Sequence, residues 1–239
     1  MNTKRSTLLF LHGSGCNGAV WAHQSRFFSS RYRVVAPDLP GHGRHKGELK
    51  KDIADYAWWV FSEIKRQGLE KPVVIGHSLG GAIALQLAIQ MPDVPGALVL
   101  VGTGARLRVH PKLLETIRNN YEEALSMVSD YAFSPATAPN LIGSTRRQMR
   151  KSPAEVLLED FQACDHFDVM QDVAGIALPT LVVVGQDDRL TPIRYSEYLH
   201  KNILGSRLEI VANAGHMVML EQPEVFNNIL LDFLEAMHE

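Results

Sequence analysis

The chain has 239 residues, enough for one α/β domain with a full core or for two small domains. Its apolar fraction of 46% and charged fraction of 21% are ordinary for a soluble globular protein, and a formal net charge of −2 offers nothing that would attract nucleic acid or acidic membranes. No stretch approaches the roughly 20 apolar residues that span a bilayer. The apolar run after Lys4 and Arg5 is too short for an export signal, and two cysteines suggest no disulfide framework, so we predict a cytoplasmic protein without a membrane or nucleic-acid partner.

Short β-branched runs alternate with segments of helical period, a pattern typical of a parallel sheet covered by helices on both faces. Six strands are predicted, at residues 6–12, 33–38, 72–77, 97–102, 180–185 and 207–211. Helices are predicted where apolar residues recur every three or four positions. These stripes are Ile53, Ala57, Val60, Phe61 and Ile64, then Leu199, Ile203 and Leu204, and a final one from Pro223 through Phe226, Ile229, Leu230 and Phe233. Before the second stripe, Thr191-Pro192 predicts a helix N-cap followed by proline at the first helical position.

The region from about Ala105 to Val169 is the longest interval without a predicted strand. It contains short helical segments at 111–119, 121–129 and 153–163, which are separated by proline-containing joints. An insertion of this length is typical of a lid over the sheet, and the alternative is plain helical decoration.

The most informative motif is Gly76-His77-Ser78-Leu79-Gly80, which lies between an apolar strand and a helical segment of small residues. In that context G-x-S-x-G is a nucleophile elbow, a sharp turn that exposes the serine. Glycines on both sides allow strand and helix to approach closely. The motif alone could also be a glycine-rich turn that binds a phosphate or no ligand, but its flanking pattern favours Ser78 as a nucleophile.

A serine nucleophile needs a base and an acid that orients the base, and loops at the carboxyl ends of parallel strands can supply both. Asp187 and Asp188 follow the fifth predicted strand, and His216 follows the sixth. Either aspartate alone could cap a helix, and the histidine alone could be structural. Because they follow consecutive strands in the chain order expected with this elbow, we predict a triad of Ser78, His216 and one of the two aspartates.

An oxyanion requires two N–H donors in addition to the triad. The first predicted donor is the backbone N–H of Leu79, which follows the nucleophile. The second should come from the His12-Gly13-Ser14-Gly15 loop after the first strand. We predict the N–H of Ser14, with Gly15 as the alternative.

Other conspicuous residues have weaker functional interpretations. His42 and His45 have metal-like spacing, but no third ligand is near them in the sequence, so no metal site is predicted. Cys16 could reach the mouth of the site as a bystander. Four residues, Phe133, Phe161, Phe167 and Met217, could line an apolar pocket or simply pack in the core.

Together these motifs resemble those of the α/β-hydrolase superfamily, in particular its small bacterial esterase-like members with a helical cap. The resemblance covers essentially the whole chain and rests on residues 12–15, 38–43, 76–81, 185–188 with Pro192, and 215–216 followed by 221–223. It implies an α/β-hydrolase fold with helices on both faces of the sheet, and it assigns the triad acid to Asp188 rather than Asp187. It also implies a core of residues 1–104 and 170–239 with a helical cap at 105–169.

In one respect the chain departs from the family pattern. Members usually begin with a β-hairpin, whereas here the strand that leads to the HG loop starts within the first ten residues. The resemblance therefore implies a six-stranded parallel sheet in the order 2-1-3-4-5-6, with strand 33–38 as a bare edge. Since exposed edges favour aggregation, we expect a loop or a second copy of the chain, as in a homodimer, to cover it.

The predicted function is that of a serine hydrolase that cleaves a small or medium carboxylic ester, or a thioester, through an acyl-enzyme and without a cofactor. On the same fold the triad could instead serve a carbon–carbon bond hydrolase or a hydroxynitrile lyase. A ligand receptor with slow turnover is the alternative from another class. A halide-releasing enzyme is disfavoured, because it needs a carboxylate where Ser78 stands.

Overall fold

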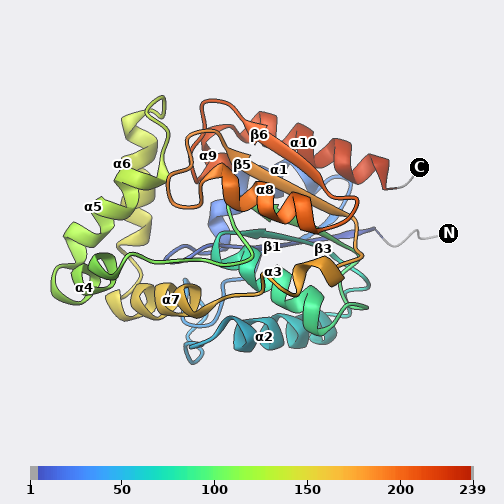
Figure 1. Ribbon diagram of the computed structural model, residues 1–239, viewed down its shortest axis with the longest axis horizontal. Coiled ribbons are helices and arrows are strands. Elements are labelled where there is room, and N and C mark those ends of the chain that lie inside the picture. Colours follow the sequence, from blue (N-terminus) through green and yellow to red (C-terminus); the bar gives the residue numbers. More distant parts are fainter. Residues whose placement is uncertain (1–4, 238–239) are drawn as a thin grey trace.

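The computed structural model describes residues 5–237, so that Lys4 and the outermost residues of the predicted core, 1–4 and 238–239, lie outside the described part. Within that part, six parallel strands form one sheet in the order β2-β1-β3-β4-β5-β6 (Figure 1). Their bounds are β1 (Thr7–Leu11), β2 (Arg33–Val35), β3 (Val73–His77), β4 (Ala97–Val101), β5 (Thr180–Gly185) and β6 (Arg207–Val211). The predicted sheet and strand order are confirmed. Strand β2 lies on one side of β1 and β3 lies on the other, so the direction in which strands are added reverses at β1. The switch point of this topology therefore lies between β1 and β3.

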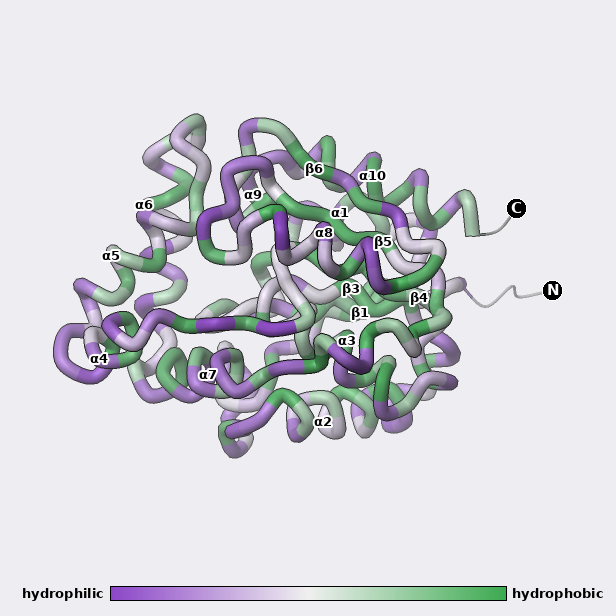
Figure 2. Tube along the Cα trace, in the orientation of Figure 1, coloured by the Kyte–Doolittle hydropathy of each residue, from purple (hydrophilic) through white to green (hydrophobic). Residues whose placement is uncertain are grey.

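Helices cover both faces of the sheet, as predicted for strands that are apolar on both sides. Leu9 and Leu11 of β1 enter one layer of the core, while Leu8 and Phe10 enter the other. The first layer contains residues of α2 (Ile53–Arg66), α3 (Leu79–Gln90) and α8 (Ile193–Asn202). The second contains residues of α1 (Ala22–Phe28), α9 (Val218–Glu221) and α10 (Pro223–Ala236), together with the 3-10 helix η1 (Gly18–Trp21). Figure 2 shows hydrophobic residues concentrated along the central strands and α3.

Between β4 and β5 the chain forms four helices, which pack partly on one another. They are α4 (Pro111–Asn119), α5 (Tyr121–Ala132), α6 (Pro139–Met149) and α7 (Ala154–His166), followed by the 3-10 helix η2 (Val173–Gly175). Helix α7 contributes Leu157 to the small core of this segment. It contributes Cys164 to the layer of the sheet core that contains α2, α3 and α8, which we call the main core, so it joins the two. In Figure 1, α4, α5 and α6 lie beside the sheet, on the side away from both termini.

The chain enters and leaves this helical segment side by side. Val169 N–H donates to the carbonyl of Ala105, and Leu107 N–H donates to that of Phe167, at 2.8 and 3.4 Å. A short antiparallel bridge between Arg106 and Asp168 lies in the same pair of segments. Residues 105 and 169 therefore meet at the base of the segment.

The structure corrects several details of the predicted elements. The edge strand β2 ends at Val35 rather than Asp38, because the Asp38 carboxylate accepts the N–H groups of Gly18 and Arg44 at 2.9 and 2.8 Å and draws the chain out of the sheet. So short an edge exposes few backbone groups, and its cover by a loop or a second copy stays a prediction. Leu204 lies beyond the end of α8 and is 91% exposed, so it is not part of the predicted apolar stripe. Helix α6, which begins with Pro139 in its first turn, was not among the predicted helices.

No helix in residues 5–237 combines the length and the apolar character that a bilayer crossing requires.

Strand β3 and helix α3 approach each other so closely that Gly76, near the end of β3, tolerates no side chain. A Cβ atom there would lie 2.2 Å from the carbonyl oxygen of Gly80, which is backbone and cannot move aside. We expect Gly76→Ala to lower the free energy of unfolding by about 3 kcal/mol or more, as measured by urea denaturation. The matched control is Gly175→Ala, since a Cβ atom at Gly175 meets nothing within 4 Å and its effect should stay within about 1 kcal/mol. Equal stability of the two variants would contradict the close approach.

Candidate active site

Ser78 forms the single-residue junction between β3 and α3. Its φ of 52° and ψ of −114° are unfavourable for a residue with a Cβ atom, and the surrounding hydrogen bonds hold this conformation. Ser78 N–H donates to the carbonyl of Val101 at 2.9 Å, and the Ser78 carbonyl accepts the hydroxyl of Thr103 at 2.9 Å. The serine stands at the carboxyl end of the sheet, where it lines a cavity of about 490 Å³.

Asp188 and His216 meet at the same edge, from the loops after β5 and β6. The Nδ1 atom of His216 lies 2.9 Å from Oδ2 of Asp188, and both side chains are buried. Asp187 points elsewhere, since its carboxylate accepts a hydrogen bond from the hydroxyl of Ser134 in the helical segment. The geometry thus distinguishes the two aspartates, which their positions in the sequence could not do.

The predicted N-cap at Thr191 is wrong. Helix α8 begins at Ile193 with Pro192 in the capping position, and no side chain caps it. The Thr191 hydroxyl instead donates to Oδ2 of Asp188 at 2.8 Å and lies 3.1 Å from Nδ1 of His216. Thr191 N–H also donates to Oδ1 of Asp188, at 2.8 Å. The residue holds the carboxylate because the loop folds back on Asp188 before the helix starts.

The surroundings of Asp188 favour its ionised form. Burial alone would raise its pKa, but the neighbouring His216 and the hydrogen bonds from Thr191 outweigh burial and lower the pKa below its ordinary value of 3.8. A carboxylate accepts the proton of His216 Nδ1–H. The Nε2 atom of a neutral His216 is then left without a proton and can act as a base.

The loop that carries His216 is held by contacts that sequence reasoning missed. Oε1 of Glu221 accepts the N–H groups on either side of the histidine, those of Gly215 and Met217, at 2.9 and 3.1 Å. Oε2 accepts Ser134 N–H at 2.9 Å, which connects the loop to the helical segment. The sequence showed Glu221 only as part of the resemblance to a family, and nothing local to it indicates this role.

His77, the residue before the nucleophile, supports the same loop. Its Nε2 atom lies 3.0 Å from the carbonyl oxygen of His216, which can only accept, so Nε2 carries the proton. Burial holds the pKa of His77 well below its ordinary value, and the proximity of His216 lowers it further. His77 is therefore a neutral donor.

The predicted oxyanion donors differ in their availability. Leu79 is the first residue of α3, where an N–H has no acceptor within the helix. Gly15 N–H is occupied, since it donates to Oδ2 of Asp160 at 3.0 Å. In the described part of the chain, Ser14 N–H has no hydrogen-bond acceptor. Of the two predicted alternatives, only Ser14 keeps its amide free.

A cavity of about 490 Å³ lies between the sheet edge and the helical segment. Ser14, Ser78 and His216 line it, together with apolar side chains that include Phe133, Phe161 and Met217. Phe167 does not line this cavity and packs in the main core instead. Cys16 also reaches the cavity, and burial raises the pKa of its thiol to about 12, so it stays protonated and unreactive near neutral pH.

Among residues 5–237, no cluster of three or more His, Cys, Asp or Glu side chains has an arrangement that could hold a metal ion. His42 is buried against Asp160, and His45 lies apart from it against the ring of Trp59. The pair therefore shares no metal-binding geometry.

The known proteins that this chain resembles include hydrolases and esterases. A family model described as the alpha/beta hydrolase family matches residues 8–229. The pimeloyl-[acyl-carrier protein] methyl ester esterase of Neisseria meningitidis serogroup B is 30% identical over 241 residues, which cover 95% of this chain and 92% of the relative. The structure of a thermophilic esterase is 36% identical, with a TM-score of 0.86, and the match covers 98% of this chain and 91% of that one. The structure of an N-acyl homoserine lactone degrading enzyme is 26% identical, with a TM-score of 0.85 and coverage of 95% and 93%.

The contacts of Glu221 make it a stabilising residue of the His216 loop. Glu221→Gln keeps the shape of the side chain but leaves one acceptor oxygen where the carboxylate has two, so buried N–H groups lose their partners. We expect the free energy of unfolding to fall by about 1–3 kcal/mol in urea denaturation. Glu197→Gln, at an exposed position of α8, should change it by less than about 0.5 kcal/mol. A variant at position 221 as stable as this control would show that these contacts contribute nothing.

The lowered pKa of Asp188 predicts a dependence of stability on pH. Since the native pKa lies below the ordinary 3.8, ionised Asp188 stabilises the fold at all pH values above 3.8, and this contribution disappears as the pH falls through the native pKa. Asp188→Asn lacks the ionisation. Urea denaturation of both proteins should show a difference in free energy of unfolding that is constant near neutral pH and shrinks below about pH 4. A difference independent of pH would contradict the shift.

Proposed function

Because the chain belongs to the alpha/beta hydrolase family, whose model matches residues 8–229, we propose that it is a serine hydrolase that cleaves small or medium carboxylic esters through an acyl-enzyme. One observation carries the proposal: Ser78 and His216 line the same cavity, and Nδ1 of that histidine lies 2.9 Å from Asp188. A thioester has the same carbonyl geometry and is the next substrate class to test.

In the proposed mechanism, Oγ of Ser78 attacks the ester carbonyl carbon while Nε2 of His216 takes the hydroxyl proton. Asp188 keeps the proton of Nδ1 in place and stabilises the imidazolium that forms. The negative charge moves to the carbonyl oxygen, where the N–H groups of Leu79 and Ser14 would bind it. His216 then gives its proton to the departing alcohol. A water molecule, activated by the same histidine, releases the acid and restores Ser78.

The conformation of Ser78 supports its role as the nucleophile. A residue with a Cβ atom at positive φ is strained, and such strain is found at functional sites, where the surroundings keep a side chain in a required orientation. Ser78 also precedes the N-terminus of α3, whose free N–H groups and partial positive charge favour an oxyanion.

The size and lining of the cavity support a small or medium substrate. About 490 Å³ falls within the range of sites for small molecules, and most of the side chains around it are apolar. Leu113, Val128 and Phe161 come from the helices between β4 and β5. We propose that residues 105–169 act as a cap, whose helices set the size of acyl or alcohol group that the site accepts.

The relatives support the ester class. The Neisseria protein is named for a methyl ester, the thermophilic protein is named an esterase, and the third relative is named for a lactone, which is a cyclic ester. All these substrates share the carbonyl that the proposed mechanism requires.

A panel of p-nitrophenyl esters of increasing acyl length tests the proposal. We expect the highest kcat/KM with short acyl chains and a loss of at least about 10³-fold in Ser78→Ala, because the nucleophile is gone. Ser62→Ala removes a hydroxyl from an exposed position of α2 and should hydrolyse the esters like the wild type. Equal rates in the wild type and Ser78→Ala would refute the mechanism. So would a wild-type protein that a fluorophosphonate probe fails to label.

A further inference from the structure

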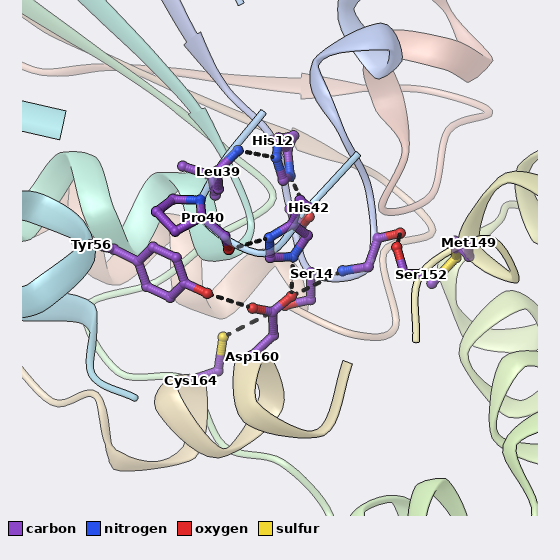
Figure 3. Close-up of polar contacts among 12 residues, drawn as sticks. His12, Ser14, Leu39, Pro40, His42, Tyr56, Met149, Ser152, Asp160 and Cys164 are labelled. Carbon is purple, nitrogen blue, oxygen red and sulfur yellow. Dashed lines mark hydrogen bonds and ion pairs between the residues drawn. The ribbon is translucent and has the colours of Figure 1, made fainter. Parts of the chain in front are cut away.

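A buried polar cluster, which we call the Asp160 cluster, joins helix α7 to the core (Figure 3). It consists of His12, His42, Tyr56 and Asp160, and each of these side chains is fully buried. His12 follows β1, His42 lies in the loop after β2, Tyr56 comes from α2 and Asp160 from α7. The proposed mechanism uses none of them.

The Asp160 carboxylate is the acceptor at the centre of this cluster. Its Oδ1 atom accepts the hydroxyl of Tyr56 at 3.0 Å, and its Oδ2 atom lies 2.8 Å from Nε2 of His42. Oδ2 also accepts the backbone N–H of Gly15, at 3.0 Å. A residue of the proposed cap thereby binds the main chain of the loop that contains Ser14.

The hydrogen bonds assign protons to both histidines. The Nδ1 atom of His42 faces the carbonyl of Pro40 at 3.0 Å and its Nε2 atom faces Asp160, so both ring nitrogens donate and the ring is cationic. Burial would lower the pKa of His42, but the Asp160 carboxylate outweighs burial and raises it. His12 is neutral, because its Nε2 atom accepts Leu39 N–H at 3.0 Å while burial lowers its pKa to about 4.

The same contacts fix the loop on both sides of Ser14. The Gly13 carbonyl accepts from Nδ1 of His12 at 2.9 Å and from Cys16 N–H at 3.2 Å. The Gly15 N–H is bound by Asp160, and the Gly15 carbonyl accepts the hydroxyl of Ser152 at 3.3 Å. Within the described residues, the Ser14 N–H between these fixed groups is left without an acceptor, beside the cavity that Ser78 lines.

We propose that Asp160, paired with cationic His42, is a positioning residue that holds the Gly15 N–H and so aims the Ser14 N–H at the oxyanion. This inference rests on the proposed function and adds a residue from outside its triad. Stability alone explains the pair poorly, because a buried ion pair often contributes no more to stability than well-packed apolar residues of the same volume. A carboxylate at this point does what an apolar residue cannot. It accepts the Gly15 N–H, which would otherwise be free to bind the oxyanion in place of the Ser14 N–H.

Asp160→Asn tests the proposal, because it keeps the shape of the side chain and removes the charge that His42 and Gly15 bind. We expect kcat for a short p-nitrophenyl ester to fall about 10- to 100-fold with KM changed by less than about threefold, since a misplaced oxyanion donor affects the transition state and not the bound ester. Affinity for a trifluoromethyl ketone, which forms a tetrahedral adduct with serine, should fall by the same factor as kcat.

Tyr56→Phe is the matched control. It removes a hydrogen bond to the other oxygen of the same carboxylate and leaves the Gly15 contact in place. Its melting temperature should fall, though by less than that of Asp160→Asn because no charge is left unpaired, while its kcat stays within about threefold of wild type. A merely structural role of the cluster would lower kcat equally in both variants, or in neither, and either result would overturn the proposal.

His42→Gln provides a second test that holds if Asp160→Asn does not fold. Without the cation the buried charge of Asp160 is uncompensated and Oδ2 keeps only the Gly15 N–H, which it then holds less firmly. The value of kcat should therefore fall at constant KM, and a wild-type kcat would overturn the proposal. Wild-type turnover that depends on Ser78 keeps the proposed function standing even if the Asp160 and His42 variants behave like the wild type. A wild type without such turnover would overturn both.

Discussion

Strand β3 passes into helix α3 through a single residue, and the other features of the site depend on how closely these two elements approach. A Cβ atom at Gly76 would meet the carbonyl of Gly80, and one at Gly80 would meet the carbonyl of Leu11 at the end of β1, so neither glycine has room for a side chain. Ser78, between them, is held at positive φ by hydrogen bonds to Val101 and Thr103. The strain at this residue is offset by the burial of the strand and helix around it, which are apolar over nearly their whole length.

The parallel sheet brings the remaining groups to the same place. In the order β2-β1-β3-β4-β5-β6, the loops after β1, β5 and β6 all emerge at the edge where β3 ends. Leu11 pairs with Gly76 and His77 pairs with Val101, so the strand ends are nearly level. Short loops at the ends of these strands are therefore enough to bring together residues that are far apart in the sequence.

The helices between β4 and β5 attach to this edge through polar contacts as well as apolar ones. Asp187 and Glu221 of the core bind Ser134, and Asp160 of α7 binds the loop after β1. Apolar packing has little directional preference, whereas a buried hydrogen bond is lost unless both partners are correctly placed. These contacts set the orientation of the helical segment over the cavity, and they bind the loops that carry His216 and Ser14.

Much of the architecture could be predicted from the sequence, because its signals are local. Apolar runs with turn residues at their ends located all six strands of the described sheet, and the glycines around Ser78 marked the turn. Each of these features arises from residues within a few positions of one another, and strand ends predicted which loops share an edge.

Only the tertiary structure decided which polar side chain binds which partner. Asp187 and Asp188 are adjacent in the sequence and face different partners, Ser134 and His216, 53 and 28 positions away. Thr191 looked like a helix cap but binds Asp188 and His216, because the loop folds back before the helix begins. Asp160 reaches Gly15 across 145 positions of sequence, a contact that no periodicity or motif encodes. Hydrogen bonds of this kind depend on the orientation of whole elements, and packing over the entire core determines that orientation.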